Sequence, residues 1–247
     1  MKTILIPIIT ALSLNISAQS DEYVTNDGTL KIHPLFHSTM VLEWNGKTIY
    51  IDPYSGAEKF EKFPKPDLIL ITDVHFDHLD KKTLEGLNTS ETTFIVPQAV
   101  KDQLDVKSKE VVVINNGEKK SWGSTGIEAV PMYNLPEADD AFHNRGRGNG
   151  YVLTIGGKRI YISGDTGATP EMRGLKNIDI AFICMNLPYT MDINQAAEGV
   201  LAFKPKVVYP FHTRNEDGSF SDVKKFKELV SSKNKNIEVR LRDWYPQ

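Results

Sequence analysis

Short apolar runs recur along the chain, and turn residues separate them. Two pairs of runs are divided by only two residues: Thr39–Trp44 and Lys47–Ile51 by Asn45-Gly46, and Tyr151–Ile155 and Lys158–Ile162 by Gly156-Gly157. Such dipeptides supply the positive backbone angles that a tight hairpin turn needs. The pattern therefore predicts two β-hairpins, one in each half of the chain.

Further strands and helices are predicted between and after the hairpins. The β-type runs are Leu68–Thr72, Thr93–Val96, Glu110–Ile114, Ile127–Met132, Ile178–Cys184, Val207–Tyr209 and Ile237–Leu241. Helical spacing of apolar residues predicts helices over Lys81–Leu87, Gln98–Leu104, Pro170–Gly174, Ile193–Phe203 and Ser221–Ser231. We expect a capping residue at Ser221 to start the last helix. Two hairpin series with interleaved helices predict an α+β domain with packed sheets and outer helices.

The first 18 residues differ from the rest of the chain. Lys2 precedes an apolar run from Ile4 to Leu14, and the small residues Ser17 and Ala18 follow. This is the layout of a secretory signal peptide, and the run is too short to span a bilayer. We expect cleavage after Ala18, one domain over residues 19–247, and an exported protein, periplasmic or extracellular, without a stable membrane span. The oligomeric state stays open.

The net charge and the cysteine content argue against one class of partner and one kind of covalent link. The 247 residues carry a formal net charge of -3, which argues against nucleic acid because phosphate binding needs a concentrated basic surface. The single cysteine, Cys184, excludes an intrachain disulfide. It lies in the apolar run Ala181–Met185, so we expect a buried core side chain rather than a nucleophile.

Four potential metal ligands follow the strand predicted over Leu68–Thr72. They are Asp73, His75, Asp77 and His78, all within six residues. In an extended segment alternate residues share one side, and adjacent His78 can turn toward a second ion. Carboxylates and imidazoles crowded at a strand end repel or desolvate one another unless a cation compensates. The segment therefore predicts a metal site.

These residues resemble the metallo-β-lactamase-fold hydrolases, whose signature is His-x-His-x-Asp-His after a strand. The resemblance runs from about Ile32 to His212, and its landmarks are His37-Ser38-Thr39, Ile51-Asp52-Pro53, Asn149–Val152, Tyr161–Thr166 and Tyr209–His212. Within that family the chain looks most like the branch of ascorbate-6-phosphate lactonases and N-acylphosphatidylethanolamine-type phospholipases. The resemblance implies a four-layer αββα sandwich with its ligands on loops at one edge of the sheets.

The same resemblance implies a ligand set for two divalent metal ions. One ion would be held by Asp73, His75 and His143, the other by Asp77, His78 and His212, with Asp165 bridging them. Two alternatives stay open. His143 lies in a long loop and can be read as a surface histidine, and Asp165 between two small residues can be read as a turn carboxylate.

One position departs from the family pattern. The first ligand in the family is a histidine, and this chain has Asp73. An aspartate can ligate zinc, so the site is not lost. The charge of two divalent ions would be balanced by Asp73, Asp77, Asp165 and a bridging hydroxide. We therefore expect a harder, less electrophilic centre, for which zinc is preferred and manganese or iron are alternatives.

The function expected from this site is hydrolysis of an ester, lactone or phosphodiester in a small-molecule or lipid-like substrate. Asp77 or Asp165 would act catalytically by moving the proton to the leaving group. His37 is expected near the mouth of the site. Asn186 and Tyr189 either line the pocket or form a plain turn. The alternative function is a metal-binding protein without turnover, in which Asp73 marks a degenerate centre.

Overall fold

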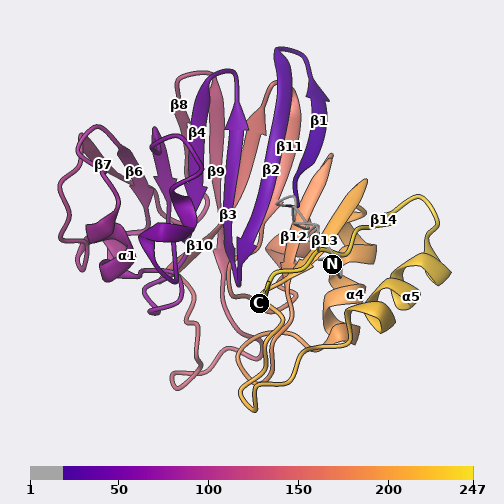
Figure 1. Ribbon diagram of the computed structural model, residues 1–247. Helices are drawn as coiled ribbons and strands as arrows, with labels where there is room; N and C mark the ends of the chain where they lie inside the picture. The colour runs from indigo at the N-terminus through magenta and orange to yellow at the C-terminus, as the bar shows by residue number, and fades with distance from the viewer. Residues whose placement is uncertain (1–18, 247) are drawn as a thin grey trace, which may run out of the picture.

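The computed structural model of the protein describes residues 19–246, and two β-sheets form its centre (Figure 1). The first sheet has the strand order β1 (Asp21–Thr25), β2 (Gly28–Phe36), β3 (Thr39–Trp44), β4 (Lys47–Ile51), β5 (Leu68–Leu70), β6 (Thr93–Val96) and β7 (Glu110–Val113). The second has the order β14 (Glu238–Val239), β13 (Val207–Phe211), β12 (Ile180–Cys184), β11 (Lys158–Ile162), β10 (Gly148–Ile155), β9 (Thr125–Met132) and β8 (Lys119–Trp122). The signal peptide predicted over residues 1–18 lies outside the described residues, so export stays a prediction.

The two sheets repeat one plan of strand directions. In the first sheet β1 to β4 are antiparallel neighbours and β4 to β7 are parallel. In the second, β8 to β11 are antiparallel and β11 to β14 are parallel. Parallel strands need crossover connections, and helices supply several of them. These are η1 (Ala57–Phe60), α1 (Lys81–Gly86), α2 (Gln98–Lys101), α3 (Pro170–Arg173), α4 (Ile193–Phe203) and α5 (Val223–Lys233).

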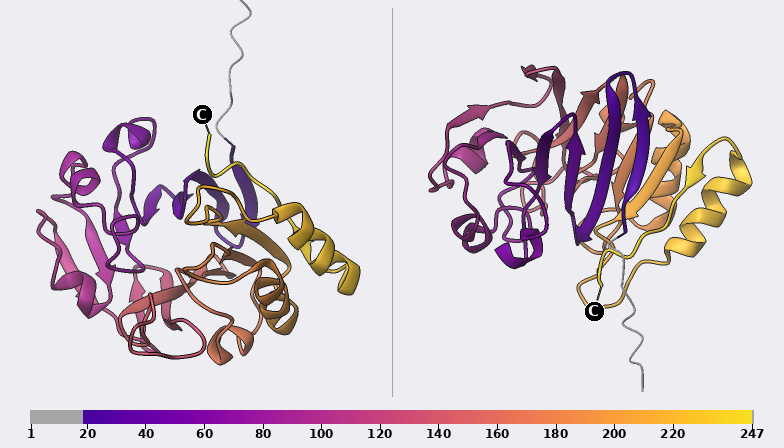
Figure 2. Two further views of the ribbon diagram at one scale, coloured as in Figure 1. Left: turned by 90° about the horizontal axis from the view of Figure 1, so that it is seen from below. Right: turned by 45° about the horizontal axis from the view of Figure 1, so that its top comes forward.

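The alternation of side chains along the strands explains the layers. On β3, Met40 and Leu42 join the core between the sheets, while Val41 joins a second core on the outer face. On β5, Leu68 and Leu70 face inward in the same way. Helices η1, α1 and α2 cover that outer face, and α4 and α5 cover the outer face of the second sheet (Figure 2). Because both faces of each sheet are buried, the fold is the α+β layered domain that the sequence pattern predicted and the four-layer αββα sandwich that the family resemblance implied.

Several predicted elements are confirmed and others need correction. The first hairpin, strand β11 and helix α4 have the predicted bounds. Strands β1, β2 and β8 were missed, and Pro34 within β2 is one reason because proline weakens a strand pattern. Helix α5 begins two residues later than predicted. Its cap is Asp222, which accepts from the backbone of Lys225, whereas Ser221 donates to the carbonyl of Met185.

The loops that carry the predicted ligands gather at one edge of both sheets, the lower edge in Figure 1. The loops follow the carboxyl ends of the parallel strands β5, β11, β12 and β13. The turn between β2 and β3, which carries His37, lies at the same edge. The loop before β10 reaches this edge because Gly148 has no side chain: a Cβ there would lie 2.7 Å from the carbonyl oxygen of Thr72. Within residues 19–246, no helix is long and apolar enough to cross a membrane.

Candidate metal centre

All seven predicted ligands lie at this edge and come from four segments. Asp73, His75, Asp77 and His78 follow β5; His143 precedes β10; Asp165 follows β11; and His212 follows β13. Two site histidines, His37 with φ 60° and His212 with φ 48°, have left-handed backbone conformations. Such positions cost about 1–3 kcal/mol each and persist where surrounding structure holds them. The centroids of their rings lie 3.9 Å apart, and the ring planes are tilted by 37°.

His78 is fully buried, and its outer nitrogen is fixed by Asp52. The Nδ1 of His78 lies 2.8 Å from Asp52 Oδ2, and Asp52 also accepts from the backbone and hydroxyl of Thr72. A carboxylate accepts only, so Nδ1 of His78 carries a proton and Nε2 is the ring nitrogen that faces the site. A carboxylate behind a metal-binding histidine is the usual way to fix its ring.

His143 is fixed in the same way by Asn134. The Nδ1 of His143 lies 3.2 Å from Asn134 Oδ1, which also accepts from the backbone N–H of His143. The amide nitrogen of Asn134 donates to the carbonyl of Tyr189, and this contact sets the orientation of the amide. His143 is 2% exposed and its Nε2 points inward with a free lone pair. The surface reading of His143 is therefore wrong.

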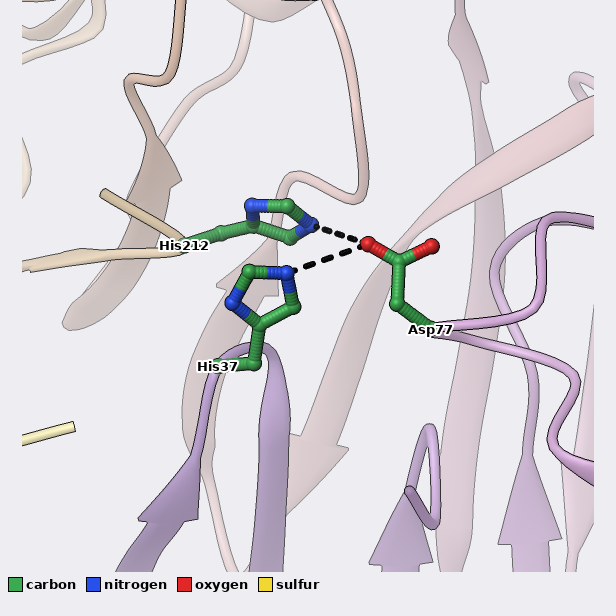
Figure 3. Close-up of side chains that lie close together, drawn as sticks. All are labelled: His37, Asp77 and His212. Atoms are coloured by element: carbon green, nitrogen blue, oxygen red, sulfur yellow. Dashed lines mark hydrogen bonds and ion pairs between the residues drawn. The ribbon is translucent and has the colours of Figure 1, made fainter. Parts of the chain in front are cut away.

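His37 differs from both, because it presents a proton. The hydroxyl of Tyr245 accepts from the backbone N–H groups of Thr213 and Arg214, at 3.0 and 3.1 Å, so its own proton goes to Nδ1 of His37, 2.8 Å away. The Nε2 of His37 then carries the hydrogen and donates to Asp77 Oδ2, at 3.1 Å (Figure 3). Burial lowers the pKa of His37 to about 4, so the ring is neutral at pH 7.

Asp165 lies at the centre of the remaining donors. Its Oδ2 is 3.5 Å from His78 Nε2 and 3.4 Å from His143 Nε2, and its Oδ1 is 3.5 Å from His212 Nε2. The Nε2 of His212 is also 3.2 Å from Asp77 Oδ2 (Figure 3). Ligand atoms about 2.0–2.2 Å from a tetrahedral zinc lie roughly 3.3–3.6 Å apart. We call these five residues, Asp77, His78, His143, Asp165 and His212, the Asp165 cluster.

Unpaired atoms support a cation at the Asp165 cluster. Among the described residues, eight buried side-chain nitrogen or oxygen atoms have no hydrogen-bond partner. Five of the eight belong to the cluster: His78 Nε2, His143 Nε2, Asp165 Oδ1 and both ring nitrogens of His212. A buried polar atom without a partner is costly, and a shared metal ion would satisfy four of these atoms together. The donor set therefore fits a divalent metal ion.

The charges at the cluster also favour a cation. Burial by itself would raise the pKa of Asp165, but the imidazoles of His212 and His78 outweigh burial and hold the pKa well below its usual range. Burial by itself would lower the pKa of His78, and the carboxylates of Asp165, Asp77 and Asp52 raise it instead. Burial of Asp77 is outweighed in the same way by His78, His212 and His37, which lower its pKa. The carboxylates therefore stay ionised and attract positive charge.

The other end of the ligand loop is different, because Arg147 lies there. Its Nε donates to Asp73 Oδ1 at 3.0 Å and its Nη2 donates to Asp73 Oδ2 at 2.8 Å. The same Nη2 lies 3.3 Å from His75 Nε2. The Nδ1 of His75 is 3.1 Å from Asp73 Oδ2. We call Asp73, His75 and Arg147 the Asp73 cluster. The charge count made from the sequence omitted this arginine.

A cavity of about 340 Å³ opens at the Asp165 cluster. His37, Asn186 and Tyr189 line it, which agrees with the pocket-lining alternative for Asn186 and Tyr189; their contact with a substrate stays a prediction. Phe76 and Phe142 also line it and remain 74% and 47% exposed. The cavity is therefore a mixed surface, with polar groups at its floor and aromatic side chains at its rim. Cys184 is fully buried in the main core, as predicted, and burial raises the pKa of its thiol to about 12.

Sequence reasoning missed four residues that organise this site: Asp52, Asn134, Arg147 and Tyr245. Asp52 stood in a matched landmark, and its position after a strand was the only sign of a role behind His78. Arg147 lies between two glycines close to His143, a pattern that permits close approach of its backbone. Tyr245 carries no local signal, because it acts through a contact with His37, 208 positions away. Asn134 contacts His143 across nine residues of a loop that no strand or helix pattern describes.

Comparisons with known proteins agree with the fold. A family model described as a beta-lactamase superfamily domain matches residues 31–212. A UPF0173 metal-dependent hydrolase from Staphylococcus saprophyticus is 30% identical over 211 residues, covering 79% of this chain and 92% of that protein.

Two solved structures are also similar to this chain. One, from Parabacteroides distasonis, is described as a metal-dependent hydrolase; it is 38% identical with a TM-score of 0.81 and covers 93% of this chain and 100% of that one. A metallo hydrolase from Ignicoccus hospitalis is 26% identical with a TM-score of 0.71, covering 87% and 95%. The chain therefore belongs to the UPF0173 family of metal-dependent hydrolases within the beta-lactamase superfamily.

Proposed function

We propose that the protein hydrolyses an ester, lactone or phosphodiester bond in a small or lipid-like molecule, with a metal ion held by the Asp165 cluster. The observation that carries this proposal is the set of buried, unpaired donor atoms around Asp165. A metal held there would lower the pKa of water and polarise the oxygen of the bond being cleaved. Zinc suits the mixture of imidazole and carboxylate donors, with manganese or iron as alternatives.

The residues beside the donors have distinct roles in this proposal. Asp77 accepts a hydrogen bond from His37 on Oδ2, and its Oδ1 has no hydrogen bond within the described residues, so Oδ1 can take a proton from the attacking water and pass it to the leaving group. His37 holds the Asp77 carboxylate in place through its Nε2 hydrogen. The Nε2 atoms of His78, His143 and His212 surround the carboxylate of Asp165, so all four side chains can bind one ion.

The cavity wall favours a substrate with an apolar group next to the cleaved bond. Phe76, Phe142 and Tyr189 supply aromatic surface, and the rings of Phe142 and Tyr189 pack edge to face. Arg214 and Glu216 add one charge of each sign to the lining, so a strongly anionic substrate is not favoured. A phosphodiester or lactone is preferred on the resemblance to the lactonase and phospholipase branch, which is an argument by analogy.

The test is turnover and metal content in the same preparation. We expect metal-loaded protein to hydrolyse at least one of a p-nitrophenyl ester, a γ-lactone and bis-p-nitrophenyl phosphate. Asp165→Asn should lower kcat/KM on the order of 10³-fold and release the metal. Asp179→Asn is the matched control, since Asp179 pairs with Lys206 at the start of the strand that ends near the site. Bound metal without turnover on any of the three substrates would favour the metal-binding alternative.

A further inference from the structure

The two clusters at this edge differ in whether their polar atoms are paired. Both oxygens of Asp73 accept from Arg147, and Asp73 is fully buried. The acceptor nitrogen of His75 faces Arg147, and its other nitrogen faces Asp73. The buried oxygens of Asp73 are not among the unpaired buried atoms of the described residues, whereas the Asp165 cluster supplies five of those atoms. The carboxylate of Asp73 is therefore fully paired without a metal ion.

Hydrogen bonds to Asp73 and to the backbone of Phe142 fix the position of the Arg147 guanidinium. Its Nη2 donates to the carbonyl of Phe142 at 2.6 Å in addition to Asp73. Its loop is anchored nearby, since the backbone N–H of Asn149 donates to the carbonyl of Thr72 at 2.9 Å. The side chain of Asp73 approaches that loop closely, and a Cβ at Gly148 would lie 3.2 Å from Asp73 Oδ1. A bidentate guanidinium held from two sides is a fixed positive charge.

We propose that Arg147 is a resident cation that takes the place of a metal ion beside Asp73 and His75, so that the protein holds one metal at the Asp165 cluster. Two effects act against a second ion there. Asp73 and His75 would have to exchange their bonds to Arg147 for bonds to the metal, and the guanidinium would repel a divalent ion a few ångströms away. This inference rests on the proposed function, because it assumes that the Asp165 cluster binds metal.

The consequence concerns what Asp73 does. In the two-metal hypothesis Asp73 is a ligand in place of the family histidine. In the present proposal Asp73 is the counter-ion of Arg147, and an aspartate at this position is needed because a histidine would not neutralise a partly buried guanidinium. The aspartate and the arginine are therefore one feature of the site.

The experiment counts metal ions in the protein after it has been stripped of metal and titrated with Zn²⁺ or Co²⁺. Calorimetry gives the stoichiometry, and the visible absorption of Co²⁺ gives the number of sites filled. We expect one ion in the wild type and two in Arg147→Met, with the second site tightened on the order of 100-fold because the fixed charge is gone. Arg147→Met combined with Asp73→Asn should return to one ion, because the vacated site has lost its carboxylate.

Arg145→Met is the control, because Arg145 pairs with Glu137 and Glu171 rather than with Asp73. It should bind one ion. If Arg147→Met does not fold, the ion count of the wild type decides by itself, since this proposal expects one ion and the two-metal hypothesis expects two. Two equally tight ions in the wild type, or one ion in folded Arg147→Met, would overturn the inference and leave the hydrolase proposal standing. No ion in the wild type would overturn both.

Discussion

The Asp73 cluster and the Asp165 cluster lie at the two ends of one short loop and compensate their buried charges in different ways. At the Asp73 end, a carboxylate and an imidazole are paired with Arg147, and every contact is within the chain. At the Asp165 end, the fixed nitrogens of His78 and His143 point at a carboxylate from 3.4 to 3.5 Å without making hydrogen bonds. The difference shows that histidine and aspartate side chains close together do not by themselves make a metal site. Their hydrogen-bond partners decide which nitrogen and oxygen lone pairs remain available to a metal ion.

Removing the hydrogen bond between Asp52 and His78 should have the largest effect on the difference between the two clusters. Asp52→Asn places an amide N–H₂ opposite Nδ1 of His78 and favours the tautomer whose Nε2 is protonated and cannot bind metal. We expect metal affinity to fall about 10–100-fold, measured by competition with a chelating dye. Asp67→Asn is the control, since Asp67 accepts from the backbone of Thr48 away from the site. Equal metal affinity in the two variants would contradict the role of Asp52.

A smaller effect is expected from removing the hydroxyl that fixes His37. In Tyr245→Phe, Nδ1 of His37 loses its donor, so the ring is free to change tautomer. We expect kcat/KM to fall about tenfold with metal content unchanged, because a positioning contact is lost and no ligand is removed. Nitrogen-15 chemical shifts of the imidazole report the tautomer directly. Tyr50→Phe, which loses a bond to the carbonyl of Pro64, should change neither quantity. An unchanged His37 tautomer in Tyr245→Phe would refute the assignment.

The smallest effect on the metal site is expected from a mutation in another buried aspartate–arginine pair, which lies away from the site. Asp21 accepts from Arg240 and Arg242 where β1 meets the chain after β14. Asp21→Asn should leave metal binding unchanged and lower the free energy of unfolding at pH 7 by about 1.5–3 kcal/mol. A loss of metal in this variant would show that buried Asp–Arg pairs act on the site through general stability.

The pH dependence of this pair follows from the pKa of Asp21. Burial by itself would raise that pKa, but hydrogen bonds from Arg242 and Arg240 hold it below the ordinary value of 3.8. Because the folded pKa is the lower one, the stabilisation is complete well above pH 3.8 and is lost as the pH falls through the lowered value. Denaturant unfolding of wild type and Asp21→Asn should therefore differ at pH 7 and converge under acidic conditions. A constant difference would contradict this sign.

Much of the fold was predictable because its signals are local. The Asn45-Gly46 and Gly156-Gly157 turns indicated two hairpins, and the cluster after Thr72 indicated the candidate metal site. The predicted ligands all reached one edge of the sheets, and their individual roles stay proposals. Arg147 and Tyr245 could not be assigned roles, since each depends on a contact with a residue 74 or 208 positions away. Pairing across such distances is decided by sheet packing, which no local pattern records.

The most direct test of the account is the position of the metal in crystals grown with Zn²⁺ and measured at the zinc absorption edge. We expect one anomalous peak, about 2.0–2.2 Å from a carboxylate oxygen of Asp165 and from Nε2 of both His78 and His212, with Arg147 still paired to Asp73. A fully occupied peak between Asp73 and His75, with the Arg147 guanidinium displaced, would contradict it.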